Sequence, residues 1–505
     1  MQTIPTPKPI VPLRNRQDLF LSESQVRQPS LAYHSDSPVS FDRLCLFCFG
    51  WAMASLLHCL SFSERFTSEF PFSYALIVAA SLVILNPRSV GLFLVMVSMS
   101  LCNTLTWMPQ EPNHILFEFI VNLGILSALG WALFRHFRAG GTREMLQTPL
   151  VRVGLFNAFA PFVRLSLVVL YFFAVLHKLN WDYFNIDISC STVLLKGYGH
   201  RLPFIPINTF TQWGAVVGTL VVETAIPVLL CFRRTRLAGI LLGMGFHYFL
   251  AIHPAQGLFS FSGLLFASYL LFVPMSLPGK VQQLATSWFG KATQKVAFAC
   301  RALLILGILG LVAAGATTHA VGLLVCLVWG ALLIAGYLLM MRGFTAGNER
   351  MGPLLRVQTA AFWLVPTALI FNGLNPYLGL KTEKSFSMFS NLRTEGGVSN
   401  HVLIRKVAYL TDVQNDLIDI KATNLAALQA FADQQELITY FKLRSITSTA
   451  KQDFYAQYTR NGVLQTVRVV NGVSTQPELL KPYPWLVNKF VRFRAVNKGA
   501  CLCKH

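Results

Sequence analysis

Residues 319–341, HAVGLLVCLVWGALLIAGYLLMM, contain no Asp, Glu, Lys or Arg. About 20 apolar residues in a helix span the hydrocarbon core of a bilayer, so this run predicts a transmembrane helix. Ten other apolar runs approach or exceed spanning length. They lie near residues 44–62, 70–86, 89–108, 114–134, 163–180, 211–232, 237–254, 257–275, 296–315 and 354–373. The sequence therefore predicts an all-α, polytopic membrane bundle of about eleven transmembrane helices.

The overall composition supports a membrane protein. Of 505 residues, 54% are hydrophobic and 13% are charged, whereas soluble domains carry about 25% charged residues. The formal net charge is +20, but the basic residues form short clusters between apolar runs. A nucleic-acid groove would instead need a basic stripe interleaved with aromatic residues. We therefore expect the lipid bilayer as a partner and no nucleic acid.

The charges of the loops predict the orientation of the chain. Lys and Arg gather in every second loop. They are Arg88, Arg135, Arg138, Arg143, Arg233, Arg234, Arg236, Lys280, Lys291, Lys295, Arg342 and Arg350. The opposite short loops, which read WMPQEPN, HPAQG and GATT, are almost without Lys or Arg. Because positively charged loops stay in the cytoplasm, we expect a cytoplasmic N-terminus in a plasma or inner membrane and, after an odd number of spans, an extracytoplasmic tail.

Four regions follow from these patterns. Residues 1–42 contain Pro5, Pro7, Pro9 and Pro12 without an apolar core, and we expect a disordered cytoplasmic leader rather than a cleaved signal peptide. Residues 43–275 hold the first eight predicted spans, and residues 276–374 hold additional transmembrane helices. Residues 375–505 change in character and form the tail.

The tail predicts a small extramembrane α+β or β-rich domain. HVLIRKVAYL (401–410) and YTRNGVLQTVRVV (458–470) alternate apolar and polar residues as strands do, and Asn461-Gly462 is a typical hairpin turn. NLAALQAFADQQ (424–435) has helical periodicity between them. Cys190, Cys501 and Cys503 all fall in predicted extracytoplasmic regions, where a disulfide among them can form, although spacing does not decide the pairing.

Six ionisable residues lie at predicted membrane depth, where an unpaired charge is costly and each is a candidate for function. They are His58, Glu118, Lys178, Glu223, His247 and His253. Lys178 ends a span within YFFAVLHKLNWDYF (171–184), among aromatic residues that include Tyr171 and Trp181. Two interpretations of Lys178 remain open: an amine that reaches the interface beside an aromatic belt, or a desolvated base tuned by the adjacent His177.

Three other ionisable residues have similarly open interpretations. His247 and His253 lie in the outer half of the seventh predicted span and can face the same cavity as Lys178, or each can simply bond a backbone carbonyl. Glu223 precedes Pro227 and can be a functional carboxyl or a neutral one that bonds carbonyls freed by the proline. HExxH, GxSxG and Walker motifs are absent from the sequence, so no metal site is predicted.

Three segments resemble a known membrane family. YFFAVLHKLNWDYF, VVETAIPVLLCFRRTRLAGILLGMGFHYFL (221–250) and GLFSFSGLLFASYLLFVP (257–274) are similar to the membrane core of vitamin K-dependent gamma-carboxylases and their bacterial homologues, the horizontally transferred transmembrane domain family. The resemblance covers roughly residues 40–275, and LGLKTEKSFSMFSNLRTEGG (378–397) also looks like a segment of the bacterial members.

The resemblance implies a chemistry and a site. In the carboxylases, a lysine of a K-K-L-D motif deprotonates vitamin K hydroquinone; oxygen addition then gives a strong base that removes a glutamate γ-proton before CO2 adds. Lys178 in H-K-L-N matches that lysine, which implies a reduced quinone, O2 and CO2 as reactants. His177, His247 and His253 would assist catalysis, and Glu223, Trp181 and Tyr171 would contact the quinol.

The match is incomplete, and other functions remain open. His177 and Asn180 replace a lysine and an aspartate of the family motif, and the tail is too short for the propeptide-recognition region of animal carboxylases. The alternative function is a non-enzymatic membrane scaffold or assembly protein whose tail binds an extracytoplasmic protein or peptide. A third interpretation, a transporter, would place Glu118, Asn122 and Glu223 along a pore.

Overall fold

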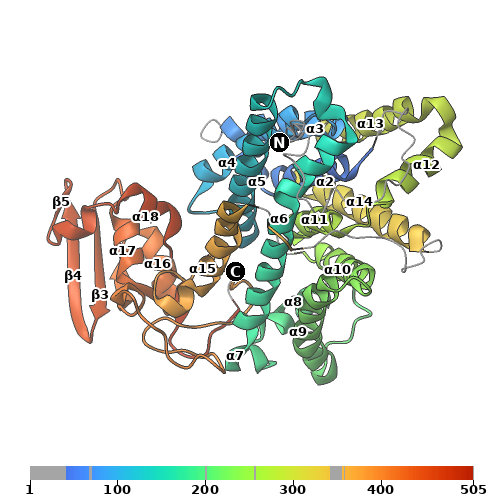
Figure 1. Ribbon diagram of the computed structural model, residues 1–505. Coiled ribbons are helices and arrows are strands. Elements are labelled where there is room, and N and C mark those ends of the chain that lie inside the picture. The colour runs from blue at the N-terminus through green and yellow to red at the C-terminus, as the bar shows by residue number, and fades with distance from the viewer. Residues whose placement is uncertain are drawn as a thin grey trace, which may run out of the picture.

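The computed structural model describes residues 41–67, 71–199, 202–254, 258–341, 355–357 and 359–503. It is mostly helical, at 66%, with a small C-terminal β-sheet domain. In Figure 1 the sheet lies to one side of the helical bundle, and α15 lies between them. The leader expected over residues 1–42 lies outside the described residues, except for its last two positions.

Seven helices of the described residues are long and apolar enough to cross a membrane. They are α2 (Arg43–Ser61), α4 (Val90–Trp107), α5 (Asn113–Arg138), α6 (Pro149–Lys178), α9 (Thr209–Cys231), the joined α12 (Leu277–Phe289) and α13 (Thr293–Ala313), and α14 (Thr318–Met341). The shorter apolar helices are α3 (Pro71–Leu85), α10 (Arg236–Ala251), and α11 (Leu258–Tyr269) with its extension η4 (Leu270–Phe272). The last predicted span, near 354–373, corresponds in the described residues to α15 (Leu364–Leu378). The number of eleven spans stays a prediction.

The centre of the bundle is α2, which packs against α3, α6, α11 and α14. Nearly all of its residues are buried, and Trp51 and Phe47 are among the largest fully buried side chains. Asp42 caps the helix by accepting a hydrogen bond from the Cys45 backbone N–H at 2.8 Å, which satisfies one of the free donors at a helix start. A helix that is apolar on all sides is expected at such a buried position.

The helix that carries Lys178 is longer than the apolar run predicted. The run near 163–180 is the second half of α6, which starts at Pro149 and continues through Pro161 without a break in the assigned helix. Two short helices follow it, α7 (Trp181–Phe184) and α8 (Cys190–Gly199). These two helices and the residues around them connect the end of α6 to the start of α9, with Tyr183 and Cys190 fully buried.

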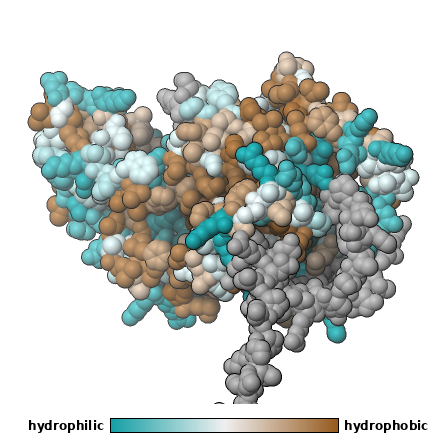
Figure 2. All heavy atoms as spheres, turned by 45° about the horizontal axis from the view of Figure 1, so that its top comes forward, coloured by the Kyte–Doolittle hydropathy of each residue, from teal (hydrophilic) through white to brown (hydrophobic). Residues whose placement is uncertain are grey.

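Large apolar side chains are exposed on many helices of the bundle. Leu82, Trp131, Leu306 and Leu332, which lie on four different helices of the bundle, are each between 44% and 67% exposed. Broad hydrophobic areas cover the helical part in Figure 2, and hydrophilic residues gather over the sheet at the left. An apolar surface of this extent needs lipid or a protein partner rather than water.

The tail forms a six-stranded antiparallel sheet in the described residues, with the order β5-β4-β3-β1-β2-β6. Its strands are β1 (Leu417–Thr423), β2 (Glu436–Thr439), β3 (Phe454–Arg460), β4 (Val463–Val470), β5 (Val473–Ser474) and β6 (Val496–Asn497). Its helices are α16 (Ala426–Asp433), α17 (Tyr440–Thr447) and α18 (Trp485–Phe490). The predicted turn is confirmed: Asn461 and Gly462 both have positive φ, 51° and 78°, as a type I′ hairpin requires.

The strand predicted at 401–410 is wrong. This segment is irregular, and its backbone N–H groups donate to the ends of helices: Val402 to the carbonyl of Leu179, and Ala408 to that of Tyr377, both at 2.9 Å. The alternating pattern therefore reflects a segment that lies along the ends of α6 and α15, with one side against the helices. Packing against helix ends can bury alternate side chains of a segment even when no neighbouring strand is present.

Candidate functional site

Lys178 is the last residue of α6 and forms an ion pair across the bundle. Its Nζ donates to both carboxylate oxygens of Glu223 on α9, at 2.7 and 3.0 Å, and to the carbonyl of Ala174 at 3.2 Å. Only 5% of the lysine side chain and 12% of the glutamate side chain are exposed. Two charges in an apolar bundle are tolerated when they neutralise each other, so each residue explains the presence of the other.

A hydrogen-bonded group of three side chains lies near this pair. Tyr171, two turns before Lys178, joins α6 to two other helices through its hydroxyl. That hydroxyl is bonded to Nε2 of His247 on α10 at 2.7 Å and to the hydroxyl of Tyr269 on α11. All three side chains are at most 4% exposed. Glu223 is near enough to act electrostatically on both tyrosines.

Gly243 on α10 makes room for the tyrosine pair. A Cβ at this position would lie 2.4 Å from the hydroxyl of Tyr269, a distance that no real side chain tolerates. Nδ1 of His247, one turn later on the same helix, has no hydrogen-bond partner among the described residues. A buried ring nitrogen without a partner is unusual and marks a place where a ligand group or water can bind.

The other predicted assisting residues lie elsewhere. His177 points away from Lys178 and donates to the carbonyl of Gly373 on α15 at 3.0 Å, with Phe173 and Tyr377 beside its ring. His253 bonds the carbonyl of Leu194 at 3.1 Å. Of the three histidines, His247 bonds Tyr171, which interacts electrostatically with Glu223, and the other two bond backbone carbonyls.

Trp181 and Asn180, which were also singled out from the sequence, follow shortly after Lys178 in the chain. Trp181 is exposed, and Asn180 caps α7. Trp181 is 61% exposed at the start of α7. Asn180 is the N-cap of that helix: its Oδ1 accepts from the Tyr183 N–H at 2.9 Å, and its Nδ2 donates to the carbonyl of Ser390 at 2.6 Å. The asparagine that departs from the family motif therefore fixes the turn after α6 and its contact with the tail.

The sequence reasoning missed a second buried polar cluster. His58 on α2 contacts Glu118 on α5 and bonds Ser260 on α11 at 2.5 Å. Ser260 also bonds His114 at 3.1 Å, and Asn122 donates to Glu118 at 3.3 Å. All five side chains are at most 7% exposed. His58 and Glu118 were recognised singly as ionisable groups at membrane depth, but Ser260 and His114 gave no separate signal.

A small cavity of about 20 Å³ adjoins this second cluster and is lined by His58, Glu118, Ser100 and Trp107. The indole N–H of Trp107 has no hydrogen-bond partner among the described residues. A volume of this size holds about one water molecule, and the lining offers it polar partners. The cavity beside the cluster can therefore hold about one water molecule.

The tail contacts the C-terminal end of α6. His401 donates from Nε2 to the carbonyl of Leu176 at 2.9 Å and pairs with Asn180 in an isolated β-bridge. A disulfide joins Cys190 at the start of α8 to Cys503, which is one of the pairings that the sequence left open. Asn391 accepts from the Cys190 N–H at 2.7 Å beside it. The segment after α15 is thus tied to α6 and α8 by hydrogen bonds and one covalent bond.

Charged residues connect the tail to the loop between α4 and α5. Lys384 forms an ion pair with Glu111 at 3.3 Å, and Lys381 lies within electrostatic reach of the same carboxyl. Burial lowers the pKa of each lysine from 10.5 to about 8 and raises the pKa of Glu111. Arg492 also donates to the carbonyl of Pro109 at 2.7 Å.

Comparisons with known proteins give no relatives: no family model, no curated protein and no solved structure matches the chain. Within the described residues, no group of three or more His, Cys, Asp or Glu side chains is placed to hold a metal ion. The site therefore has to be interpreted from its own geometry.

Proposed function

We propose that this protein is a carboxylase-like membrane enzyme that uses Lys178 and Glu223 to take a proton from a lipid-soluble quinol. The observation that carries the proposal is the buried Lys178–Glu223 pair beside the hydrogen-bonded side chains of Tyr171, His247 and Tyr269. Ionisable groups inside a membrane are costly and usually mark a site of proton transfer or binding. The resemblance of residues 171–184 to the carboxylase lysine motif supports the same assignment.

The pair can supply a base in two states. As an ion pair, Glu223 is a carboxylate and Lys178 an ammonium; after transfer of one proton between them, Lys178 is a neutral amine. Apolar surroundings reduce the advantage of the ionic form, because both charges have lost their hydration. The neutral amine then accepts a substrate proton while Glu223 holds the first one.

The side chains present fit a quinol. Its hydroxyl groups need acceptors and donors, and Nδ1 of His247 is a buried nitrogen without a partner among the described residues. Tyr171 would orient His247 through its hydroxyl. A reduced quinone, when bound, would supply the electrons for reaction with O2, and CO2 would be the group added to the substrate. Lys178 and Glu223 hold and move the proton, and the tail segment over α6 excludes water.

The proposal is tested with purified protein in detergent and a reduced naphthoquinone. Wild-type protein should consume quinol and oxygen, and Lys178→Met should lower this rate by about 100-fold or more, as expected for the loss of an acid–base group. The matched control is Lys196→Met on α8, an exposed lysine whose loss should leave the rate unchanged. A Lys178→Met variant with the wild-type rate would exclude Lys178 as the base.

Amine labelling gives an independent measurement of the same site. Lys178 should be protected from a lysine-specific reagent by the quinol, and Lys196 should not. Mass spectrometry of the labelled peptides reads both residues in one sample. Equal labelling of Lys178 with and without quinol would show that the quinol does not bind at the Lys178–Glu223 pair.

One observation favours the scaffold function as a second candidate. The edge of the tail sheet carries apolar residues that are strongly exposed: Val463 and Leu464 on β4, and Val473 on β5, at 60%, 61% and 74%. An exposed apolar strand edge is a common site for pairing with another chain. The scaffold function predicts that Leu464→Ser with Val473→Ser releases a co-purifying partner, and that Lys178→Met does not.

The proposed function also includes an orientation of the protein in the membrane. We infer a cytoplasmic N-terminus and an extracytoplasmic tail in a plasma or inner membrane, from the distribution of Lys and Arg between the loops. The Cys190–Cys503 disulfide supports this orientation, since the cytosol keeps most thiols reduced. Labelling of Lys421, an exposed lysine of the tail, by an impermeant reagent in intact cells would test it.

A further inference from the structure

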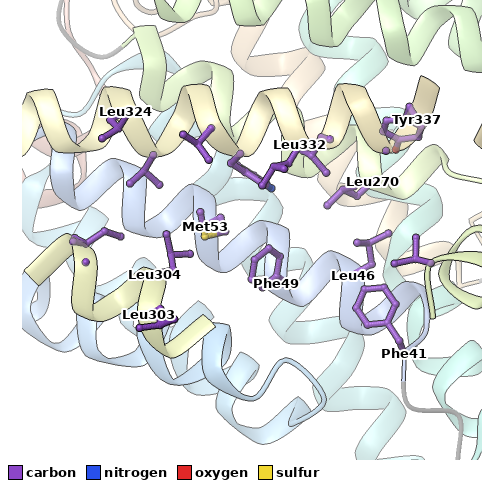
Figure 3. A pocket seen from close by; sticks show the side chains of 18 of the residues that line it. Phe41, Leu46, Phe49, Met53, Leu270, Leu303, Leu304, Leu324, Leu332 and Tyr337 are labelled. Carbon is purple, nitrogen blue, oxygen red and sulfur yellow. The ribbon is translucent and has the colours of Figure 1, made fainter. Parts of the chain in front are cut away.

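An apolar groove of about 570 Å³ lies between α2, α13 and α14. Figure 3 shows it from close by: Phe49 and Met53 on α2 form one wall, Leu304 on α13 a second, and Leu332 on α14 a third. Its volume is in the range of sites that hold small molecules. It is separate from the Lys178 pair, which joins α6 and α9.

The wall formed by α13 is thin and faces outward. Ile308 is the buried residue of this helix, and Leu303, Leu306 and Leu309 are each more than half exposed. A helix with so little packing inside the protein is surrounded by lipid on its other sides. The groove is therefore reached from the bilayer, and the molecules that enter it are hydrocarbon chains.

Two glycines widen the groove. Gly307 on α13 and Gly336 on α14 both line it, and a Cβ built on either would meet no atom within 4 Å. Packed helices normally leave few voids larger than a water molecule, so open space beside two helical glycines is unusual. The space is consistent with a chain that lies along both helices.

Polar groups mark one end of this apolar groove. Tyr337 lies there with Leu46 and Leu270 (Figure 3), and its side chain is 4% exposed. Its hydroxyl has no hydrogen-bond partner among the described residues. A buried hydroxyl without a partner is unfavourable, and a ligand oxygen at this position would satisfy it.

A cation lies near the same end. Arg301 lies on α13 three residues before the groove residue Leu304, and its side chain interacts electrostatically with Cys45, the neighbour of the groove residue Leu46. The Nε atom of Arg301 is buried and has no hydrogen-bond partner among the described residues. An arginine that lacks a partner for its Nε is suited to a phosphate, which it can bind through two parallel hydrogen bonds.

We propose that the groove binds an anionic phospholipid, with one acyl chain between α2, α13 and α14, the phosphate at Arg301 and an ester oxygen at Tyr337. The charge of Arg301 selects an anionic headgroup over a zwitterionic one. Both polar groups lie toward the predicted cytoplasmic ends of their helices, where anionic lipids gather and positive residues hold them. This lipid site is independent of the proposed quinol chemistry.

The test uses the full chain, purified and stripped of loosely bound lipid, with phosphatidylglycerol or phosphatidylcholine added back. Native mass spectrometry counts the lipids retained on the protein. Phosphatidylglycerol should be retained in preference to phosphatidylcholine, and Arg301→Gln should reduce its affinity roughly tenfold through the loss of one charge-assisted contact. Equal retention of both lipids, or no effect of Arg301→Gln, would overturn the headgroup assignment.

A substitution that fills the groove tests whether the acyl chain of the lipid binds there. Gly307→Phe should place a ring in the groove and abolish phosphatidylglycerol retention. Gly310→Phe, one turn further on α13, also meets no atom within 4 Å at its Cβ but does not line the groove, and it should retain the lipid as wild type does. Circular dichroism of both variants confirms that they fold. Retention by folded Gly307→Phe would refute the groove as the binding site.

Discussion

The Lys178–Glu223 pair makes a quantitative prediction that does not depend on the identity of the substrate. Removal of one member leaves the other as an uncompensated charge in an apolar environment, which typically costs about 3–5 kcal/mol. Because 12% of the Glu223 side chain is exposed, we expect the lower end, about 3 kcal/mol, for Lys178→Met or Glu223→Leu alone. Replacement of both residues should cost only about 1 kcal/mol, since apolar pairs often substitute for buried ion pairs.

The assay is a double-mutant cycle on unfolding in mixed micelles, followed by far-ultraviolet circular dichroism. The expected coupling energy between the two positions is about 5 kcal/mol, much larger than for surface pairs. The matched control is the Lys421–Asp419 pair at the surface of the tail, whose side chains are 46% and 18% exposed and whose carboxylate also contacts Lys498; the coupling there should stay below about 1 kcal/mol. If the losses of the two single variants at the buried pair simply add, the charges do not stabilise each other and the reasoning is refuted.

The same cycle separates stability from function. The Lys178→Met, Glu223→Leu double variant should fold nearly as well as wild type but lack quinol oxidation. A folded double variant with full activity would show that the pair only joins α6 to α9. A pair retained for structure alone has no reason to be ionic, because apolar side chains at both positions would pack as well.

Three further predictions concern the contacts around the site. Gly373→Ala should destabilise the protein by about 1–3 kcal/mol in the same unfolding assay, because its Cβ would lie 2.4 Å from the ring of Phe173; an unchanged midpoint would contradict this packing. Cys503→Ser should lower the stability of the docked tail by about 2–4 kcal/mol and expose it to limited proteolysis, since it removes the bond to Cys190; equal proteolysis rates would count against it. The buried Lys381 has a pKa of about 8 in the folded protein against 10.5 normally, so between these pH values the unfolded chain binds more protons and stability should rise with pH. Lys384 has the same lowered pKa and contributes to the rise, so Lys381→Met should make the rise in thermal unfolding smaller without abolishing it, and an identical pH slope in the variant would refute the assignment.

The sequence predicted the long helices well, because each is specified by a continuous local feature. The run at 319–341 contains no Asp, Glu, Lys or Arg, and α14 covers all of it. The signal for the hairpin turn at Asn461-Gly462 is also local, because it depends only on these two residues, both of which adopt positive φ. Features of this kind can be recognised without knowing what the neighbouring helices are.

The contacts between helices could not be predicted in the same way. Lys178 and Glu223 were both recognised, but their pairing depends on how α6 and α9 are rotated against each other. His177 precedes Lys178 in the chain and therefore points about 100° away around the helix, toward α15. Ser260, in the second cluster, is an ordinary serine in the sequence and becomes notable only when two histidines from other helices reach it.

The segment 401–410 was misassigned for a related reason. Its alternation of apolar and polar residues is the pattern of a half-buried strand, and the burial it reflects is provided by helix ends. Sequence periodicity reports that one side of a segment is covered and does not report what covers it. The strand prediction failed because a neighbouring strand was assumed.

The disulfide between Cys190 and Cys503 also sets an order of events during synthesis. The two cysteines are 313 residues apart, and at a typical rate of about 5–20 residues per second the ribosome needs roughly 15–60 seconds to make the chain between them. Throughout this interval the thiol of Cys190 has not yet met Cys503, and the C-terminal end of α6 lacks the segment that later contacts it. Cys501 lies close to Cys503 in the chain and can compete for the same partner. Formation of the correct bridge therefore marks the completion of assembly, because it requires that the helices have inserted and that the tail has folded back onto them.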